Sequence, residues 1–128
     1  MAGLNRFSKL NEERSFKEGM TLIFEERSLK VIRYSKAMRF IWDENKRQSN
    51  LSKHGFDFID ASSVFAGATF TYEDDRFAYG EQRFITLGLL DQTLVTIAHT
   101  ESNNEIRVIS MRRGTKREQL IFFRNLSN

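Results

Sequence analysis

The chain of 128 residues contains no cysteine and only two histidines, His54 and His99. The absence of cysteine excludes disulfide scaffolds, cysteine nucleophiles and thiolate metal sites. With so few imidazoles a metal site would depend on carboxylates, and the sequence holds neither a paired metal-ligand motif nor a glycine-rich phosphate loop. We therefore expect a function that uses no bound metal ion and no cofactor.

Long apolar stretches are equally scarce. No run approaches the ~18 residues of a membrane span, and the chain does not start with the apolar segment of a signal peptide. The expected location is therefore the cytoplasm. The length fits a single domain, and 40% hydrophobic with 12% aromatic residues suffice for a buried core.

The net charge of +3 conceals an uneven distribution of charged side chains. Residues 54–105 carry a net charge of −7, whereas residues 106–128 carry +5. A basic end beside an acidic middle can attract phosphate at one place while disfavouring indiscriminate binding of nucleic acid elsewhere. Ordinary solvated surface is the alternative explanation.

The residue pattern divides the chain into an N-terminal extension, residues 1–37, and a functional domain, residues 38–128. Within the extension, residues 8–19 are polar and contain a capping-box pattern, which is typical of a short helix or a tail. Residues 21–24 and 29–34 predict two short strands. The signals for helices, strands and turns are clearer in the functional domain.

The functional domain predicts an α+β fold. Asp43 is a good N-cap and Gly55 a good helix stop, so a helix is expected between them, after a short strand at 39–42. Short turns between later strands imply consecutive hairpins, hence an antiparallel β-meander sheet with two N-terminal helices and one C-terminal helix. After the first strand we expect a helix at 44–53, a second helix ending at Gly67, strands at 68–73, 82–90, 93–100 and 105–111, and a helix at 116–125. The four apolar residues at 120–123 predict that this last helix packs them inside.

Two groups of residues are candidates for proton transfer. Lys53 and His54 stand at the end of the first helix, where their positive charge also complements the helix dipole. His99 stands in the third strand of the meander and could pass a proton near neutral pH. The alternative for His99 is a packed structural histidine.

A third group consists of Arg107, Arg112 and Arg113, whose guanidinium groups are suited to bind phosphate in a fixed geometry. In a regular strand, Arg107 and Arg113 point to one face and Arg112 to the other. An irregular strand end would let all three converge near one edge. The alternative role is in surface ion pairs with Glu73, Asp74, Asp75 or Glu81, which contribute little individually.

Seven segments of the functional domain form a recognisable series. They are FIWDENK from residue 40, NLSKHGFDF from residue 50, DASSVF from residue 60, YGEQRFITLG from residue 79, HTE from residue 99, IRVISMRR from residue 106 and KRE from residue 116. In their order and spacing they resemble the BrnT family of bacterial ribonuclease toxins. The resemblance spans Met38 to about Arg124 and leaves the N-terminal extension outside.

The resemblance implies a RelE-like fold, cleavage of RNA that inhibits translation, and neutralisation by a BrnA-type antitoxin. Operator DNA is contacted only indirectly, through that antitoxin. Our hypothesis for the reaction is metal-independent cleavage, in which the RNA's own 2′-hydroxyl attacks the adjacent phosphorus and leaves a 2′,3′-cyclic phosphate. A non-catalytic RNA- or protein-binding regulator with the same fold is the alternative.

This reaction needs a base, an acid and positive charge beside the phosphate. Three kinds of residue are expected to supply them or to bind RNA. The expected proton carriers are Lys53, His54 and His99; the expected phosphate stabilisers are Arg83, Arg107 and Arg112; the expected RNA-binding residues are Arg113, Lys116 and Arg117.

Overall fold

The computed structural model describes residues 21–24, 31–33 and 38–126. The helix or tail predicted for residues 8–19 lies outside the described residues. Strands β1 (Thr21–Phe24) and β2 (Val31–Arg33) pair antiparallel. Short strands are thus confirmed in both places where the extension predicts them.

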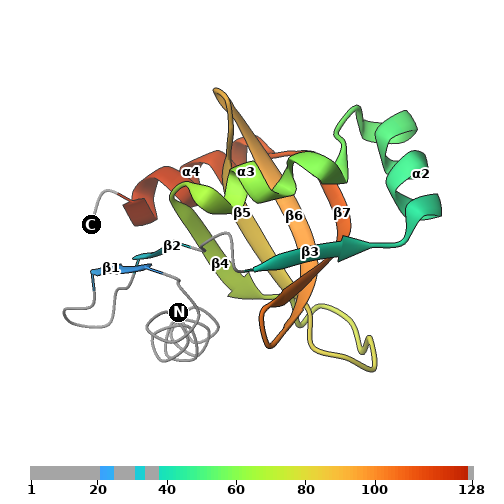
Figure 1. Ribbon diagram of the computed structural model, residues 1–128. Helices are drawn as coiled ribbons and strands as arrows, with labels where there is room; N and C mark the ends of the chain where they lie inside the picture. The colour runs from blue at the N-terminus through green and yellow to red at the C-terminus, as the bar shows by residue number, and fades with distance from the viewer. Residues whose placement is uncertain (1–20, 25–30, 34–37, 127–128) are drawn as a thin grey trace.

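A five-stranded sheet forms the centre of the functional domain (Figure 1). Its antiparallel meander is confirmed, with tight turns at Asp91 and Asn104, whose φ angles of 56° and 60° are tolerated by these residue types. The strands, in the spatial order β3-β7-β6-β5-β4, are β3 (Arg39–Trp42), β7 (Glu105–Arg113), β6 (Thr93–Ser102), β5 (Phe84–Leu90) and β4 (Thr69–Glu73).

The first strand of the sheet corrects the prediction of a purely antiparallel arrangement. β3 pairs with β7 in parallel, from Arg39 opposite Glu105 to Trp42 opposite Val108, so the sheet is mixed. A tight turn forces antiparallel pairing only on the two strands that it joins. Two strands separated by a connection that contains helices can pair in parallel. The helices between β3 and β4 provide such a connection. The RelE-like arrangement implied by the resemblance stays a prediction.

The helices begin and end at the signals in the sequence. The side chain of Asp43 accepts a hydrogen bond from the Lys46 N–H at 3.1 Å, and α2 (Glu44–His54) ends at Gly55, whose φ is 80°. The second predicted helix divides into a 3-10 turn, η1 (Phe58–Asp60), and a short helix, α3 (Ala61–Ala66). The last helix, α4, spans Lys116–Leu126.

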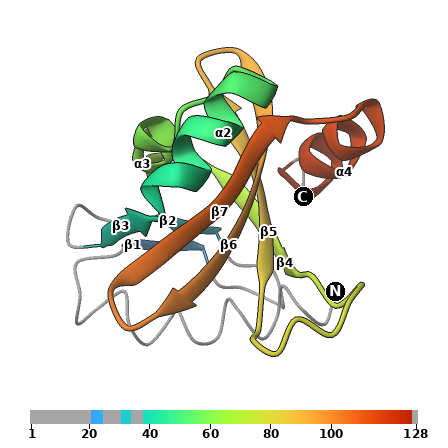
Figure 2. The same cartoon turned by 90° about the vertical axis from the view of Figure 1, so that its right-hand side faces the viewer.

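Helices cover both faces of the sheet: Figure 2 shows α2 and α3 on one side and α4 on the other. On the α3 side, a Cβ at Gly88 would lie 2.6 Å from Val64 Cγ1, so helix and strand approach at a position that only glycine fits. The core on this side includes Phe58, Val64, Phe65, Val95, Ile97, Val108 and Met111. The smaller core on the α4 side consists of Phe70, Ile85, Leu87, Leu94 and Phe122.

The apolar residues of α4 do not all pack as the sequence predicts. Phe122 is fully buried and Ile121 half-buried, but Leu120 and Phe123 are 68% and 51% exposed. A single helix on a sheet buries only one stripe of its surface. The prediction that all four apolar residues at 120–123 pack inside is therefore wrong for Leu120 and Phe123.

A buried amide joins α2 to β7. Asn50 Nδ2 donates to the carbonyl oxygens of Met111 at 2.8 Å and Phe56 at 3.1 Å, and its Oδ1 accepts from the Met111 N–H at 3.2 Å. Since β3 pairs with β7 only as far as Val108, Asn50 supplies hydrogen bonds that a strand neighbour would otherwise make. The end of α2 is thereby fixed beside the end of β7.

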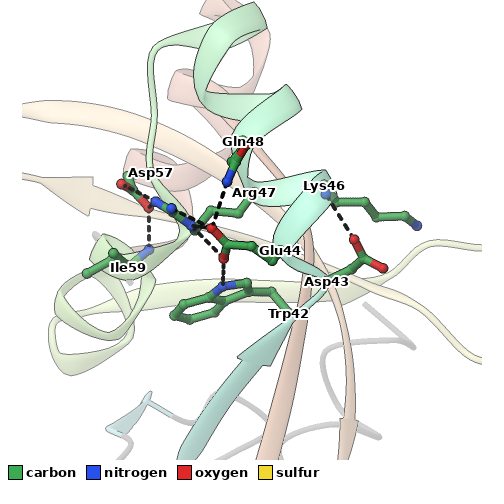
Figure 3. A network of polar contacts seen from close by, with 8 residues as sticks. All are labelled: Trp42, Asp43, Glu44, Lys46, Arg47, Gln48, Asp57 and Ile59. Carbon is green, nitrogen blue, oxygen red and sulfur yellow. Dashed lines mark hydrogen bonds and ion pairs between the residues drawn. The ribbon is translucent and has the colours of Figure 1, made fainter.

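The beginning of α2 is held by the polar network in Figure 3. Arg47 donates to Glu44 within the helix and to both carboxylate oxygens of Asp57, which precedes η1. The hydrogen bonds that Glu44 accepts, first from Arg47 and then from Gln48 and Trp42, lower its pKa to about 2. The network ties β3, α2 and η1 together, so its role is structural.

Candidate active site

An irregularity in β7 determines which side chains share a face of the sheet. Ala98 of β6 lies opposite Ser110, but the next residue, His99, lies opposite Val108. Ile109 is therefore an extra residue, a β-bulge, and it shifts the alternation of side chains by one position. The two halves of β7 must be assigned to faces separately.

The bulge brings Arg107 and Arg112 to the same face. Arg107 lies opposite Thr100 and Arg112 opposite Thr96. Thr96 and Thr100 are four residues apart in one strand and so point the same way, as do residues directly opposite each other in an antiparallel pair. The expectation that Arg107 and Arg112 point apart in a regular strand is wrong here. Arg113, opposite Val95, points to the other face.

The shared face is the one on which α4 packs. α4 covers the part of it that contains the Phe70 and Leu94 side chains. Farther along the strands the surface is only half-buried. We call this part of the sheet the open face and define it by five half-buried residues, Tyr72, Arg83, Ala98, Arg107 and Ser110.

A carboxylate joins two of the candidate arginines on the open face. Arg107 Nη2 lies 2.8 and 2.9 Å from the two carboxylate oxygens of Glu81, and Arg83 Nε lies 3.3 Å from one of them. The guanidinium of Arg83 also lies 4.1 Å from the centre of the Tyr79 ring, a cation–π distance. The hydrogen bond from Arg107 holds the pKa of Glu81 below its usual range.

Arg112 is fixed by the first turn of α4. Its two terminal nitrogens each lie 2.9 Å from an oxygen of Glu118. Glu118 also accepts from Thr96 Oγ1 at 2.8 Å and from the Thr115 N–H at 2.9 Å, completing a capping box. Burial alone would raise the pKa of Glu118, but these hydrogen bonds, above all those from Arg112, lower it to about 2.

Lys53 and His54 lie apart from this cluster. Both are exposed in the last turn of α2, just after Asn50, which contacts Met111. Met111 and Arg107 are about 13 Å apart along β7 at ~3.3 Å per residue. The structure therefore places Lys53 and His54 beside the end of β7 and not within the group formed by Glu81, Arg83 and Arg107.

His99 lies in the core on the α3 side. It is 0% exposed, and its ring contacts those of Phe65 and Phe84 at centroid distances of 5.1 and 5.9 Å. Its Nε2 is 2.7 Å from Thr86 Oγ1, and burial lowers its pKa to about 4, so the ring is neutral near pH 7. This position agrees with the alternative of a packed structural histidine.

The expected RNA-binding residues form a basic rim. Arg113 is exposed at the end of β7, and Lys116 and Arg117 are exposed in the first turn of α4. Glu81 and Glu118 were not predicted as site residues, yet each contacts a candidate arginine. The sequence offers Glu81 only as an alternative ion-pair partner of the arginines. The signal for Glu81 was its place two residues before Arg83 in the YGEQRF segment.

The fold and its open face define a small α+β protein with arginines gathered on one half-covered side of a mixed sheet. The family model described as "Ribonuclease toxin, BrnT, of type II toxin-antitoxin system" matches residues 42–118. The chain therefore belongs to the BrnT family, whose members are ribonuclease toxins paired with an antitoxin protein. The match includes every candidate residue named above. Among curated proteins, none matches the chain.

Within the part of the chain that the structure describes, no helix is long and apolar enough to cross a membrane.

The ion pair between Arg112 and Glu118 predicts a pH-dependent contribution to stability. Since folding lowers the pKa of Glu118 to about 2, the contribution is complete above the ordinary glutamate pKa and is lost as the pH falls towards 2. Glu118→Gln should reduce the free energy of unfolding by about 1–3 kcal/mol near pH 7, and by roughly half of that or less near pH 3. Urea unfolding across this range measures the difference.

The matched control is Asp75→Asn, which alters an exposed carboxylate. It should leave the free energy of unfolding nearly unchanged at every pH. An equal deficit of Glu118→Gln at both ends of the range would contradict the ion-pair account.

Proposed function

We propose that this chain cleaves RNA on its open face by attack of the RNA's own 2′-hydroxyl on the adjacent phosphorus, without a metal ion, and so inhibits translation. The single observation that supports this most is that the bulge at Ile109 places Arg107 and Arg112 on the same face of β7. Arg83 joins them through Glu81, which contacts both Arg83 and Arg107. Membership of a ribonuclease toxin family supports the same conclusion.

The proposed reaction places an additional negative charge on the phosphate in its transition state. Planar guanidinium groups stabilise such charge by paired hydrogen bonds to phosphate oxygens. The contact with Glu81 uses Nη2 of Arg107, and the N–H groups of Nε and Nη1, which flank Nη2 on either side, are the donors for phosphate oxygens. Arg112, fixed by Glu118, supplies a second positive charge on that face.

The remaining candidates have supporting roles in the proposal. Arg113, Lys116 and Arg117 bind flanking phosphates along the basic rim, which explains their exposure at the end of β7 and the start of α4. Lys53 and His54, exposed in the last turn of α2, bind the same RNA strand beyond the end of β7. His99 has a packing role in the core on the α3 side, where its ring contacts Phe65 and Phe84.

Replacing either arginine of the open face should slow RNA cleavage. Arg107→Ala and Arg112→Ala should each lower kcat by roughly 10²–10³, by analogy with donors that stabilise a developing oxyanion. Lys46→Ala is the control, because Lys46 is an exposed cation in the first turn of α2, which packs on the face of the sheet away from the open face (Figure 2). Purified protein with a labelled RNA, in the presence of a chelator, gives the rates and the product ends.

The wild-type protein should turn over and leave 2′,3′-cyclic phosphate ends. Unchanged rates in both variants would overturn the assignment of the arginines. Retention of RNA without cleavage by the wild type would instead identify the protein as the non-catalytic binding regulator.

We infer further that the partner is a BrnA-type antitoxin that contacts α4. Leu120 and Phe123 expose apolar surface on this helix and line a hollow of about 650 Å³ together with Lys116, Gln119 and Arg124. Apolar side chains between basic ones suit an amphipathic, acidic segment. A partner bound there would also cover the start of α4, which holds Arg112.

A substitution on the exposed apolar surface of α4 should weaken binding of the antitoxin and leave the rate of RNA cleavage unchanged. Leu120→Glu should lower the affinity for the co-expressed antitoxin at least roughly tenfold, because it introduces a negative charge opposite an acidic, apolar segment. Leu51→Glu, at an exposed leucine of α2, is the control and should retain the affinity. Unchanged affinity of Leu120→Glu, measured by calorimetry, would rule out this interface.

A further inference from the structure

Glu81 is the carboxylate at the centre of the arginine cluster, and the proposed function so far gives it no chemical role. Its oxygens lie 2.8 and 2.9 Å from Arg107 Nη2, and one lies 3.3 Å from Arg83 Nε. The side chain is 38% exposed, so it meets solvent and substrate while held by two positive charges. It comes from the connection between β4 and β5, at the rim of the open face.

We propose that Glu81 is the general base of the reaction and takes the proton from the attacking 2′-hydroxyl. This inference rests on the proposed function. A phosphate oxygen that accepts from Nε or from Nη1 of Arg107 lies next to the carboxylate at Nη2, because each of these nitrogens shares an edge of the guanidinium with Nη2. The 2′-hydroxyl that attacks belongs to the ribose attached to that phosphate, so it comes within hydrogen-bond reach of Glu81, as a general base requires.

The step balances without a further reactant. The Glu81 carboxylate accepts the proton of the 2′-hydroxyl, and the oxygen forms a bond to phosphorus with the electron pair of the former O–H bond. The bond from phosphorus to the 5′-oxygen breaks, and this oxygen leaves with its electron pair and takes a proton from water. The products are a 2′,3′-cyclic phosphate and a 5′-hydroxyl, and Glu81 then releases its proton to water.

The charged surroundings of Glu81 determine its dependence on pH. Arg107 faces it from β7, and Arg83 faces it from the residue just before β5. The Tyr79 ring lies against Arg83, and its hydroxyl donates to the buried Asp74 at 3.0 Å. Asp74 is itself paired with Arg76. The two contacting groups are both positive, and they keep the carboxylate ionised throughout the neutral range.

The neighbouring histidine does not compete for this role on the open face. His99 points into the core on the α3 side, where it contacts Phe65, Phe84 and Thr86.

Glu118, the carboxylate that contacts Arg112, is bound in the capping box of α4 and is 14% exposed, whereas Glu81 is 38% exposed. Of the two carboxylates, Glu81 is therefore the more accessible to a bound ribose.

The test compares kcat/KM for RNA cleavage from about pH 5 to pH 8 in the wild type, Glu81→Gln, Glu81→Asp and the control Asp75→Asn. The wild type and the control should retain their activity down to about pH 5, since the base remains ionised, whereas a histidine base would lose about 30-fold below its ordinary pKa. Glu81→Gln should lose at least roughly 10² in kcat, the usual contribution of a general base, with RNA affinity retained or increased. Glu81→Asp should recover part of the rate.

Thermal unfolding and circular dichroism of each variant verify that the fold is intact, and Glu81→Asp preserves the charge if Glu81→Gln does not fold. If Glu81→Gln cuts RNA as fast as the wild type or faster, Glu81 merely neutralises Arg107 and the inference is overturned. A wild-type profile that falls tenfold or more between pH 7 and pH 5 would overturn it too. Failure of the wild type to cut RNA at all would overturn the proposed function itself, which is a distinguishable result.

Discussion

A single inserted residue, Ile109, determines which side of β7 carries Arg107. Without it, the alternation of a regular strand would place Arg107 on the face opposite Arg112. The bulge keeps the apolar side chains of both halves of β7, Val108 and Met111, in the core on the α3 side, and it places Arg107 on the same face of the sheet as Arg112. The same bulge therefore allows the core residues of β7 to pack and determines the face on which its arginines lie.

Carboxylates of the chain itself then fix these arginines. Glu118 belongs to the capping box of α4, so the start of that helix and the orientation of Arg112 depend on the same side chain. Glu81 orients Arg107 and Arg83 from the connection between β4 and β5. The long, flexible arginine side chains are thereby fixed before RNA binds, which lowers the entropic cost of binding a phosphate. Near the C-terminal end of β7, Asn50 fixes α2 by hydrogen bonds to the backbone of Met111.

Local signals made most of the fold predictable: the caps at Asp43 and Gly55 and the turns at Asp91 and Asn104 lie where short-range chemistry requires them. Features that depend on distant segments were not predictable. The parallel pairing of β3 with β7, the bulge at Ile109 and the exposure of Leu120 are set by contacts between elements far apart in the sequence. For the same reason the candidate arginines were found by residue type and resemblance, whereas their convergence, the burial of His99 and the contacts of Glu81 required the structure.

The most direct measurement of the central claim is an NMR titration of the full chain with a short RNA that carries 2′-O-methyl groups and so cannot be cleaved. The side-chain Nε–H signals of Arg83, Arg107 and Arg112 should shift together and saturate at one RNA concentration, along with backbone signals around Ser110 on the open face. Saturable shifts confined to the end of α2, around Lys53 and His54, with the arginine signals unmoved, would contradict the location of the site.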